Sequence, residues 1–130
     1  MHITLESDYA VRIVVYLAKW GCRCDANTIA QNTGVTLRFA LKILRNLVSG
    51  GMVRSFKGTQ GGYELNRSPE DITLRDILEL VEGKYVFSRC LESGDCTRPE
   101  NTCCKVQRVF SDISKTVQEK LAAVTIADLL

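Results

Sequence analysis

The chain has 130 residues, of which 45% are hydrophobic and 25% are charged, the proportions of one ordinary globular domain, which exclude wholesale disorder. No apolar run approaches the roughly 20 residues that a membrane-spanning helix needs, and residues 1–12 lack a signal-peptide core. We therefore expect a cytoplasmic protein with no membrane partner, whose six cysteines serve metal, cluster or thiol chemistry rather than structural disulfides.

The net charge of +2 is distributed unevenly along the chain. Residues 34–67 hold six basic residues against one acid, whereas residues 68–100 hold eight acids against four bases. A basic block followed by an acidic block indicates that only the first meets a polyanion, although a solvated surface with uneven charge gives the same pattern.

The first half of the chain predicts three helices. Residues 5–20 place apolar side chains, from Leu5 to Trp20, at three- and four-residue steps, and Ser7 is the predicted cap. A short second helix ends at Gly34, and a third begins at residue 37 and ends at the Gly50–Gly51 pair. The predicted buried face of the third helix consists of Phe39, Ala40, Ile43, Leu44 and Leu47.

The second half begins with two strand-like runs, residues 52–56 and 63–65, on either side of a glycine-rich tip, which predicts a β-hairpin. A capping box at Thr73 and Asp76 starts a fourth helix that ends at Gly83. Residues 106–124 carry one apolar stripe, and Thr125 and Asp128 cap a last short turn. The predicted fold class is mainly α: a winged helix-turn-helix with a two-stranded β-wing and a long C-terminal helix.

The order helix, turn, helix and basic hairpin is that of a DNA-reading unit. A helix fits the major groove, so its exposed side chains should be polar or cationic. Glycines 58, 61 and 62 let the hairpin tip approach the sugar-phosphate backbone closely. The alternative is a small helical domain whose hairpin packs or binds protein. The predicted DNA-binding residues are Arg38, Lys42 and Arg45 on the helix and Arg54, Lys57, Thr59 and Gln60 on the hairpin.

Residues 88–104 form a polar loop that contains four of the cysteines. Their spacing is a poor zinc pattern, because structural zinc sites pair ligands at roughly two to four intervening residues. Several thiolates spread over a polar loop suit an iron–sulphur cluster; a thiol switch, zinc or no role stay open. Cys22 and Cys24 lie on a turn, as two semi-buried thiols or as a metal-binding pair.

Several segments resemble the Rrf2 family of bacterial regulators, the group of IscR and NsrR. They are SDYAVRIVVYLA (7–18), IAQNTGVTLRFALKILRNLVSGGMV (29–53), KGTQGGYEL (57–65), TLRDILELVEG (73–83), the cysteine loop and VTIADLL (124–130). The resemblance runs nearly end to end, and the Gly-Gly-Tyr of the hairpin together with the cysteine loop makes it specific.

The resemblance implies a homodimeric winged-helix regulator that binds a palindromic double-stranded DNA operator and dimerises through the long helix after the cysteine loop. It also implies a 2Fe–2S or 4Fe–4S cluster held by three cysteines, and Cys90 and Cys96 match the first two. Counting back from Phe110, which stands where the family often has a tryptophan, favours Cys104 as the third, and Cys103 is the alternative.

The fourth ligand varies within the family. Some members have a histidine three residues past the third cysteine, where this chain has Gln107, and its only histidine is His2. Others, similar to the nitric-oxide sensor, use an aspartate of the partner subunit at the start of the first helix, where this chain has Asp8. An acid at that place also favours the helix N-terminus through the dipole alone, so both interpretations of Asp8 stay open.

The expected organisation is a DNA-binding domain (1–83), a cluster-binding loop (84–104) and a dimerisation helix with a C-terminal turn (105–130). We expect a repressor whose operator affinity is controlled by the cluster, with iron status, an oxidant or nitric oxide as the signal. The alternatives are a cluster-free regulator switched by thiol oxidation or a protein partner, and an iron–sulphur holding protein. Enzyme activity is not expected, because we find no catalytic triad or nucleotide-binding fingerprint.

Overall fold

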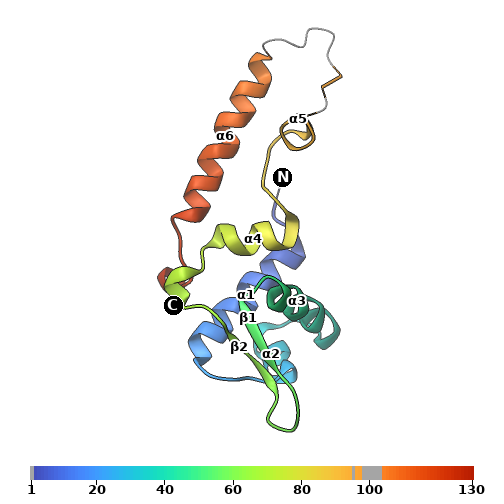
Figure 1. Cartoon of the computed structure of the whole chain (residues 1–130), viewed down its shortest axis with the longest axis vertical. Coiled ribbons are helices and arrows are strands. Elements are labelled where there is room, and N and C mark those ends of the chain that lie inside the picture. Colours follow the sequence, from blue (N-terminus) through green and yellow to red (C-terminus); the bar gives the residue numbers. More distant parts are fainter. Residues whose placement is uncertain (1, 95, 98–103) are drawn as a thin grey trace.

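The computed structural model describes residues 2–94, 96–97 and 104–130. The predicted class, mainly α with a two-stranded antiparallel wing, is confirmed (Figure 1). No helix in the described residues is long and apolar enough to cross a membrane. The α-helices, the strands and the two short 3-10 helices are, in chain order, α1 (Leu5–Trp20), α2 (Ala26–Thr33), α3 (Leu37–Ser49), β1 (Val53–Phe56), β2 (Gly62–Leu65), η1 (Pro69–Asp71), α4 (Leu74–Glu82), α5 (Arg89–Glu92), α6 (Lys105–Ala122) and η2 (Ala127–Leu129).

The core lies where α1, α2, α3 and the start of the wing meet. The two ends of the stripe predicted for α1, Leu5 and Trp20, are 59% and 50% exposed, which corrects that part of the prediction. Leu5 is rotated away from the buried face, because successive residues turn by about 100°. Trp20 is the last residue of the helix, where it stacks on Tyr16 rather than entering the core. The buried apolar face of α1 consists of Ala10, Ile13, Val14 and Leu17.

Short polar side chains set the helix boundaries. Asp25 and Thr36 accept backbone hydrogen bonds at the starts of α2 and α3, and the predicted capping box of Thr73 and Asp76 begins α4. The cap of α1 is Thr4, whose hydroxyl accepts the Ser7 N–H at 3.2 Å. The prediction that Ser7 caps this helix is therefore wrong; Ser7 lies inside the first turn, fully buried.

The wing is a hairpin of β1 and β2, paired from Val53 with Leu65 to Phe56 with Gly62. The turn between α1 and α2 joins it, because the backbones of Cys24 and Tyr63 exchange hydrogen bonds of 2.9 and 2.8 Å. This bridge fixes the base of the wing to the helical core. The wing tip extends to the end of the molecule opposite α5 and the start of α6 (Figure 1).

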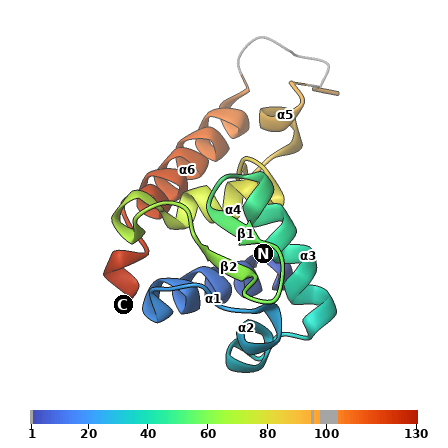
Figure 2. The ribbon, with the colours of Figure 1, turned by 60° about the horizontal axis from the view of Figure 1, so that its bottom comes forward.

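The end of the chain returns to the core after α6. The N–H of Ile126 donates to the carbonyl of Ile72 at 2.8 Å, and the Ile126 side chain is completely buried. Thr125 and Asp128 hydrogen-bond each other across the last short turn, as their predicted pairing requires, at 2.8 Å from the Thr125 N–H to the carboxylate and 3.3 Å from the Asp128 N–H to the Thr125 hydroxyl. The N-cap of η2 itself is Ile126, which has no side-chain cap. Helix α4 consequently lies between α6 and the helical core (Figure 2).

The first half of α6 leaves much of its apolar surface uncovered within one chain. Ser114 is the buried residue of this helix, and its hydroxyl accepts the N–H of Phe87 at 2.9 Å. The segment between α4 and α5 therefore packs along one side of α6. Another side, which carries the predicted stripe, is 36–56% exposed at Val106, Val109, Phe110 and Ile113.

Candidate nucleic-acid interface and cysteine segment

Helix α3 presents a cationic face to solvent. Its buried face consists of Ala40, Ile43, Leu44 and Leu47, and the predicted fifth member, Phe39, is only half-buried. On the opposite side Arg38, Lys42 and Arg45 are exposed, as predicted, and Leu41 is 37% exposed beside them. A surface hollow runs along this face, lined by Thr36, Leu37, Arg38, Phe39, Leu41, Lys42 and Arg45.

The five predicted cations differ in their intramolecular partners. Lys42 is paired with Glu6 of α1 at 2.7 Å, and Arg54 is paired with Glu64, its cross-strand neighbour, also at 2.7 Å. In the part of the chain that the structure describes, no side chain or carbonyl binds the remaining three, Arg38, Arg45 and Lys57. These three charges are therefore free to meet an external anion.

The wing tip carries the other predicted contact residues. Lys57, Thr59 and Gln60 are all exposed. Arg23, from the turn between α1 and α2, lies over the Phe56 ring at 3.4 Å and donates to the Gln60 carbonyl at 3.0 Å. Arg23 thus holds the tip against the turn between α1 and α2. Sequence reasoning missed this role because residues 23 and 60 are far apart in the chain.

The glycines of the tip have a structural reason as well as the predicted one. Gly62 has φ +147°, and a Cβ there would lie 2.7 Å from the Cys24 carbonyl oxygen. A Cβ at Gly61 would lie 2.5 Å from the Phe56 carbonyl oxygen. Both positions therefore need glycine to close the wing and dock it on the core, whether or not DNA is near. Gly58, at φ +94°, has open space around it.

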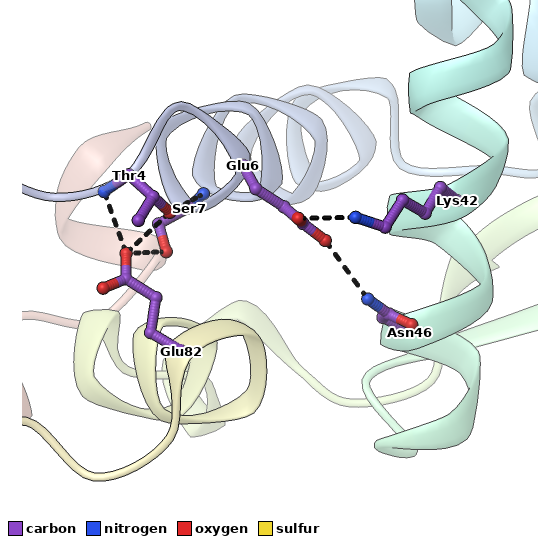
Figure 3. A network of polar contacts seen from close by, with 6 residues as sticks. All are labelled: Thr4, Glu6, Ser7, Lys42, Asn46 and Glu82. Atoms are coloured by element: carbon purple, nitrogen blue, oxygen red, sulfur yellow. Dashed lines mark hydrogen bonds and ion pairs between the residues drawn. The ribbon is translucent and has the colours of Figure 1, made fainter.

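The start of α1 is held by a polar network that the sequence did not indicate (Figure 3). One carboxylate oxygen of Glu82, the last residue of α4, accepts hydrogen bonds from the Thr4 N–H at 2.9 Å, the Thr4 hydroxyl at 2.8 Å and the Ser7 hydroxyl. Partial burial raises the pKa of the Glu82 carboxyl, but the bonds from Ser7 and Thr4 outweigh this and hold that pKa below its ordinary value. Glu82 thus links α4 to α1 as a carboxylate.

The neighbouring Glu6 turns toward α3 (Figure 3). One of its carboxylate oxygens accepts from the Lys42 ammonium at 2.7 Å, and the other accepts from the Asn46 amide at 3.4 Å. Helices α4, α1 and α3 are therefore connected through side chains of two adjacent residues, Glu6 and Ser7. Residues 6 and 42 lie 36 positions apart, so no local pattern could have indicated this contact.

The predicted cysteine ligands lie on both sides of the segment between α5 and α6. Cys90 belongs to α5, with its sulphur 3.0 Å from the Ser88 hydroxyl, and Cys104 is the N-cap of α6, where its sulphur accepts the Gln107 N–H at 3.4 Å. Cys96 is half-buried. The alternative ligand, Cys103, lies outside the described residues.

These thiols suit an iron–sulphur cluster in their chemistry. Cys90, Cys96 and Cys104 each supply a sulphur atom, and cysteine thiolates are the usual ligands of such clusters. Among residues 2–94, 96–97 and 104–130, however, no three His, Cys, Asp or Glu side chains are grouped closely enough to hold a metal ion. The donor type therefore fits, while the described positions show no assembled site.

Asp8 lies in the first turn of α1, as predicted, and forms an ion pair with Arg12 at 2.6 Å. Its side chain is 41% exposed, so it is open to solvent on one side. Within one chain, Asp8 belongs to no group of three or more His, Cys, Asp or Glu side chains among the described residues that could hold a metal ion. Its assignment as a ligand from the partner subunit stays a prediction.

Cys22 and Cys24 differ from each other in burial. Cys24 is 4% exposed and belongs to the core, where burial raises the pKa of its thiol. Cys22 is exposed. The prediction of two semi-buried thiols is therefore wrong, because Cys24 belongs to the core and Cys22 to the surface.

The chain is similar in sequence and structure to known proteins. The model of the Rrf2 family, described as an iron-dependent transcriptional regulator, matches residues 3–130. The chain is 31% identical to the protein aau3 of Rhizobium meliloti, over 100% of this chain and 85% of that one. The solved structure of CymR, the global cysteine regulator of Bacillus subtilis, superposes with a TM-score of 0.80 at 25% identity, covering 99% of this chain and 95% of that one. The structure of IscR from T. potens gives 0.78 at 25% identity, covering 99% and 85%.

Proposed function

The chain belongs to the Rrf2 family of transcriptional regulators, and on that premise we propose that it is a homodimeric repressor whose operator affinity is set by an iron–sulphur cluster. The DNA would be read by α3 and the wing. The cluster would be held by Cys90, Cys96 and either Cys104 or Cys103, with Asp8 of the partner subunit as the candidate fourth ligand. The signal would be iron status, an oxidant or nitric oxide. The protein would act in the cytoplasm, as a regulator and not as an enzyme.

The observation that carries the DNA-binding role is the set of three unpaired cations on α3 and the wing tip. Arg38 and Arg45 border the hollow along α3, and Lys57 lies at the tip of the hairpin. A helix in the major groove can read base edges while a flanking wing contacts the sugar-phosphate backbone. Unpaired arginine and lysine side chains at both places are what this mode of binding requires.

The proposal of a cluster rests on the family description and on the thiols. The family model describes an iron-dependent regulator, and the segment from Cys90 to Cys104 supplies the sulphur ligands that such a cluster uses. A bound cluster would supply a redox-active and exchangeable iron centre. The segment that carries these thiols joins α4 to α6, so its conformation bears both on the Glu82 contact with α1 and on the long helix.

The proposal of a homodimer rests on the uncovered stripe of α6. Val106, Val109, Phe110 and Ile113 lie on one side of a surface helix and remain 36–56% exposed. Side chains of this kind contribute about 1.5 to 3 kcal/mol each when they are fully buried. A second copy of the chain, packed on the same helix, would cover the stripe and place two recognition helices on a palindromic operator.

Oxygen-free isolation tests this proposal. We expect a coloured protein that contains iron and inorganic sulphide, binds a duplex from the region upstream of its own gene, and changes its affinity when the cluster is removed. Cys90→Ser should abolish the iron and sulphide but leave the winged domain folded. A colourless protein whose affinity for the same DNA is unchanged after incubation with iron and sulphide would favour the alternative of a cluster-free regulator. Iron and sulphide without any DNA binding would favour an iron–sulphur holding protein.

A further inference from the structure

We propose that Glu6 competes with DNA phosphates for Lys42 and thereby limits the affinity of the recognition helix for DNA. This inference rests on the proposed role of α3 in DNA binding. It concerns a residue outside the helix-turn-helix, on the first turn of α1, whose carboxylate is directed at the DNA-reading helix (Figure 3).

The contact engages both oxygens of the carboxylate. Lys42 donates to one at 2.7 Å and Asn46 to the other at 3.4 Å, and these two donors lie one helical turn apart on α3. A phosphate group would offer the same donors a similar pair of anionic oxygens. Glu6 therefore occupies, for these two side chains, the place that a DNA phosphate would take.

The start of α1, which carries Glu6, is anchored to α4, so Glu6 does not move with Lys42 when the lysine reaches toward a phosphate. Thr4 and Ser7, on either side of Glu6, are both hydrogen-bonded to Glu82 of α4, and Ser7 is fully buried. The Glu6 side chain is 23% exposed, whereas that of Lys42 is 56% exposed. The lysine is consequently the mobile partner, and reaching a phosphate means leaving an anchored carboxylate.

The energies make this competition effective but reversible. An ion pair at a protein surface contributes only about 0 to 1 kcal/mol, so DNA can displace it, and its loss corresponds to at most about a fivefold change in affinity. Each phosphate neutralised by a lysine changes the slope of log affinity against log salt concentration by about 0.9. Arg38 and Arg45 on the same face have no such partner in the described residues, so Lys42 is the cation of α3 that Glu6 withholds.

The variant Glu6→Gln tests the inference, because the amide keeps the shape of the side chain and removes its charge. With a short duplex of random sequence we expect tighter binding at low salt, by up to about fivefold. The salt slope should become steeper by up to about 0.9, the full value corresponding to a wild-type complex in which Glu6 always keeps Lys42 from the phosphate. In a Lys42→Gln background the same change should leave the slope unaltered. Glu79→Gln, which removes a charge paired with Arg75 on α4, is the matched control and should change neither quantity.

Two results would overturn the inference. The first is weaker binding of Glu6→Gln with an unchanged slope while its thermal unfolding matches the wild type, which would make Glu6 a support for α3. The second is an equal change in slope with and without Lys42, which would reduce the effect to general charge. Failure of the wild-type protein to bind any duplex would instead reject the proposed function, so the two failures are distinguishable.

Discussion

At the scale of single residues, Lys57 is the clearest test of the wing. It is exposed at the tip and contacts no partner in the described part of the chain, so its charge is available to a phosphate. We predict that Lys57→Ala weakens binding to operator and random duplexes alike and reduces the salt slope by about 0.9. Fluorescence anisotropy titrations at several salt concentrations measure both quantities.

The control for this variant is Lys115→Ala on α6. Lys115 has a side chain that is 77% exposed and lies at a weak 4.0 Å from Glu119, far from the wing along the chain. The variant Lys115→Ala removes the same charge from a surface that the proposal does not assign to DNA. An unchanged slope for Lys57→Ala, or an equal decrease in both variants, would contradict the assignment of the wing.

The contact of Glu82 makes a prediction about pH. The pKa of Glu82 in the folded chain lies below its ordinary value of 4.5, so the carboxylate stabilises the fold above that pH and loses this contribution as the pH falls through the lowered pKa. We expect Glu82→Gln to be less stable than the wild type at neutral pH, and the difference to shrink below pH 4.5. Urea unfolding across this range measures it; a constant difference would show that charge is not involved.

Single-residue features that depend on neighbours in the sequence could be predicted, whereas those that depend on residues far apart in the chain could not. The exposed cations of α3 could be predicted because the buried apolar residues of this helix recur at three- and four-residue steps, which is a local pattern. The partner of Arg54 depends on the register of the hairpin, which places Glu64 opposite it. The partner of Lys42 could not be predicted, because Glu6 meets it only through tertiary contact. The same reason explains Ser7: its hydroxyl suits a cap, but the arrival of α4 gives it Glu82 instead.

At the scale of elements, caps and glycines were sufficient for most of the boundaries. Gly34 and Gly83 end α2 and α4, and the box of Thr73 and Asp76 begins α4, as the sequence predicts. Helix α5 was not foreseen, because the four residues from Arg89 to Glu92 are too few to show helical periodicity. The bridge from Cys24 to the wing was also missed, since a single pair of residues leaves no strand pattern.

The wing itself provides the prediction at this scale. Gly62→Ala places a Cβ 2.7 Å from the Cys24 carbonyl oxygen at a residue with φ +147°. We expect it to lower the free energy of unfolding by about 1 to 3 kcal/mol, the usual cost of such backbone strain, and to weaken DNA binding because the wing no longer docks on the core. Thermal unfolding and anisotropy titrations measure the two effects.

Gly58→Ala serves as its matched control. Its φ of +94° is also unfavourable for alanine, but a Cβ there meets nothing within 4 Å. It therefore carries the backbone strain without the clash, and we expect a smaller loss of stability. Equal losses for the two variants would show that the contact with Cys24 does not determine the requirement for glycine at position 62.

At the scale of the whole molecule, the order of elements was enough to predict a winged helix-turn-helix, because each element carries its own pattern. The return of Ile126 to the core was not predicted, since one isoleucine after a long helix gives no sign of where it packs. The assembly is a further step, because a single chain shows which surface is uncovered but not what covers it. For α6 the exposed stripe coincides with the first half of the sequence stripe, from Val106 to Ile113, which makes dimerisation directly testable.

The last prediction concerns that helix. Ile113 is 39% exposed within the stripe, so Ile113→Glu would place a carboxylate in the dimer interface, where an unpaired charge is costly to bury. We expect the variant to sediment as a monomer while keeping the helical content of the wild type, and to lose most of its affinity for a palindromic operator but little for a single half-site. Lys115→Glu, on the opposite side of the same helix, adds the same side chain outside the stripe and should remain a dimer. A dimeric Ile113→Glu protein with normal operator affinity would show that α6 is not the dimerisation surface.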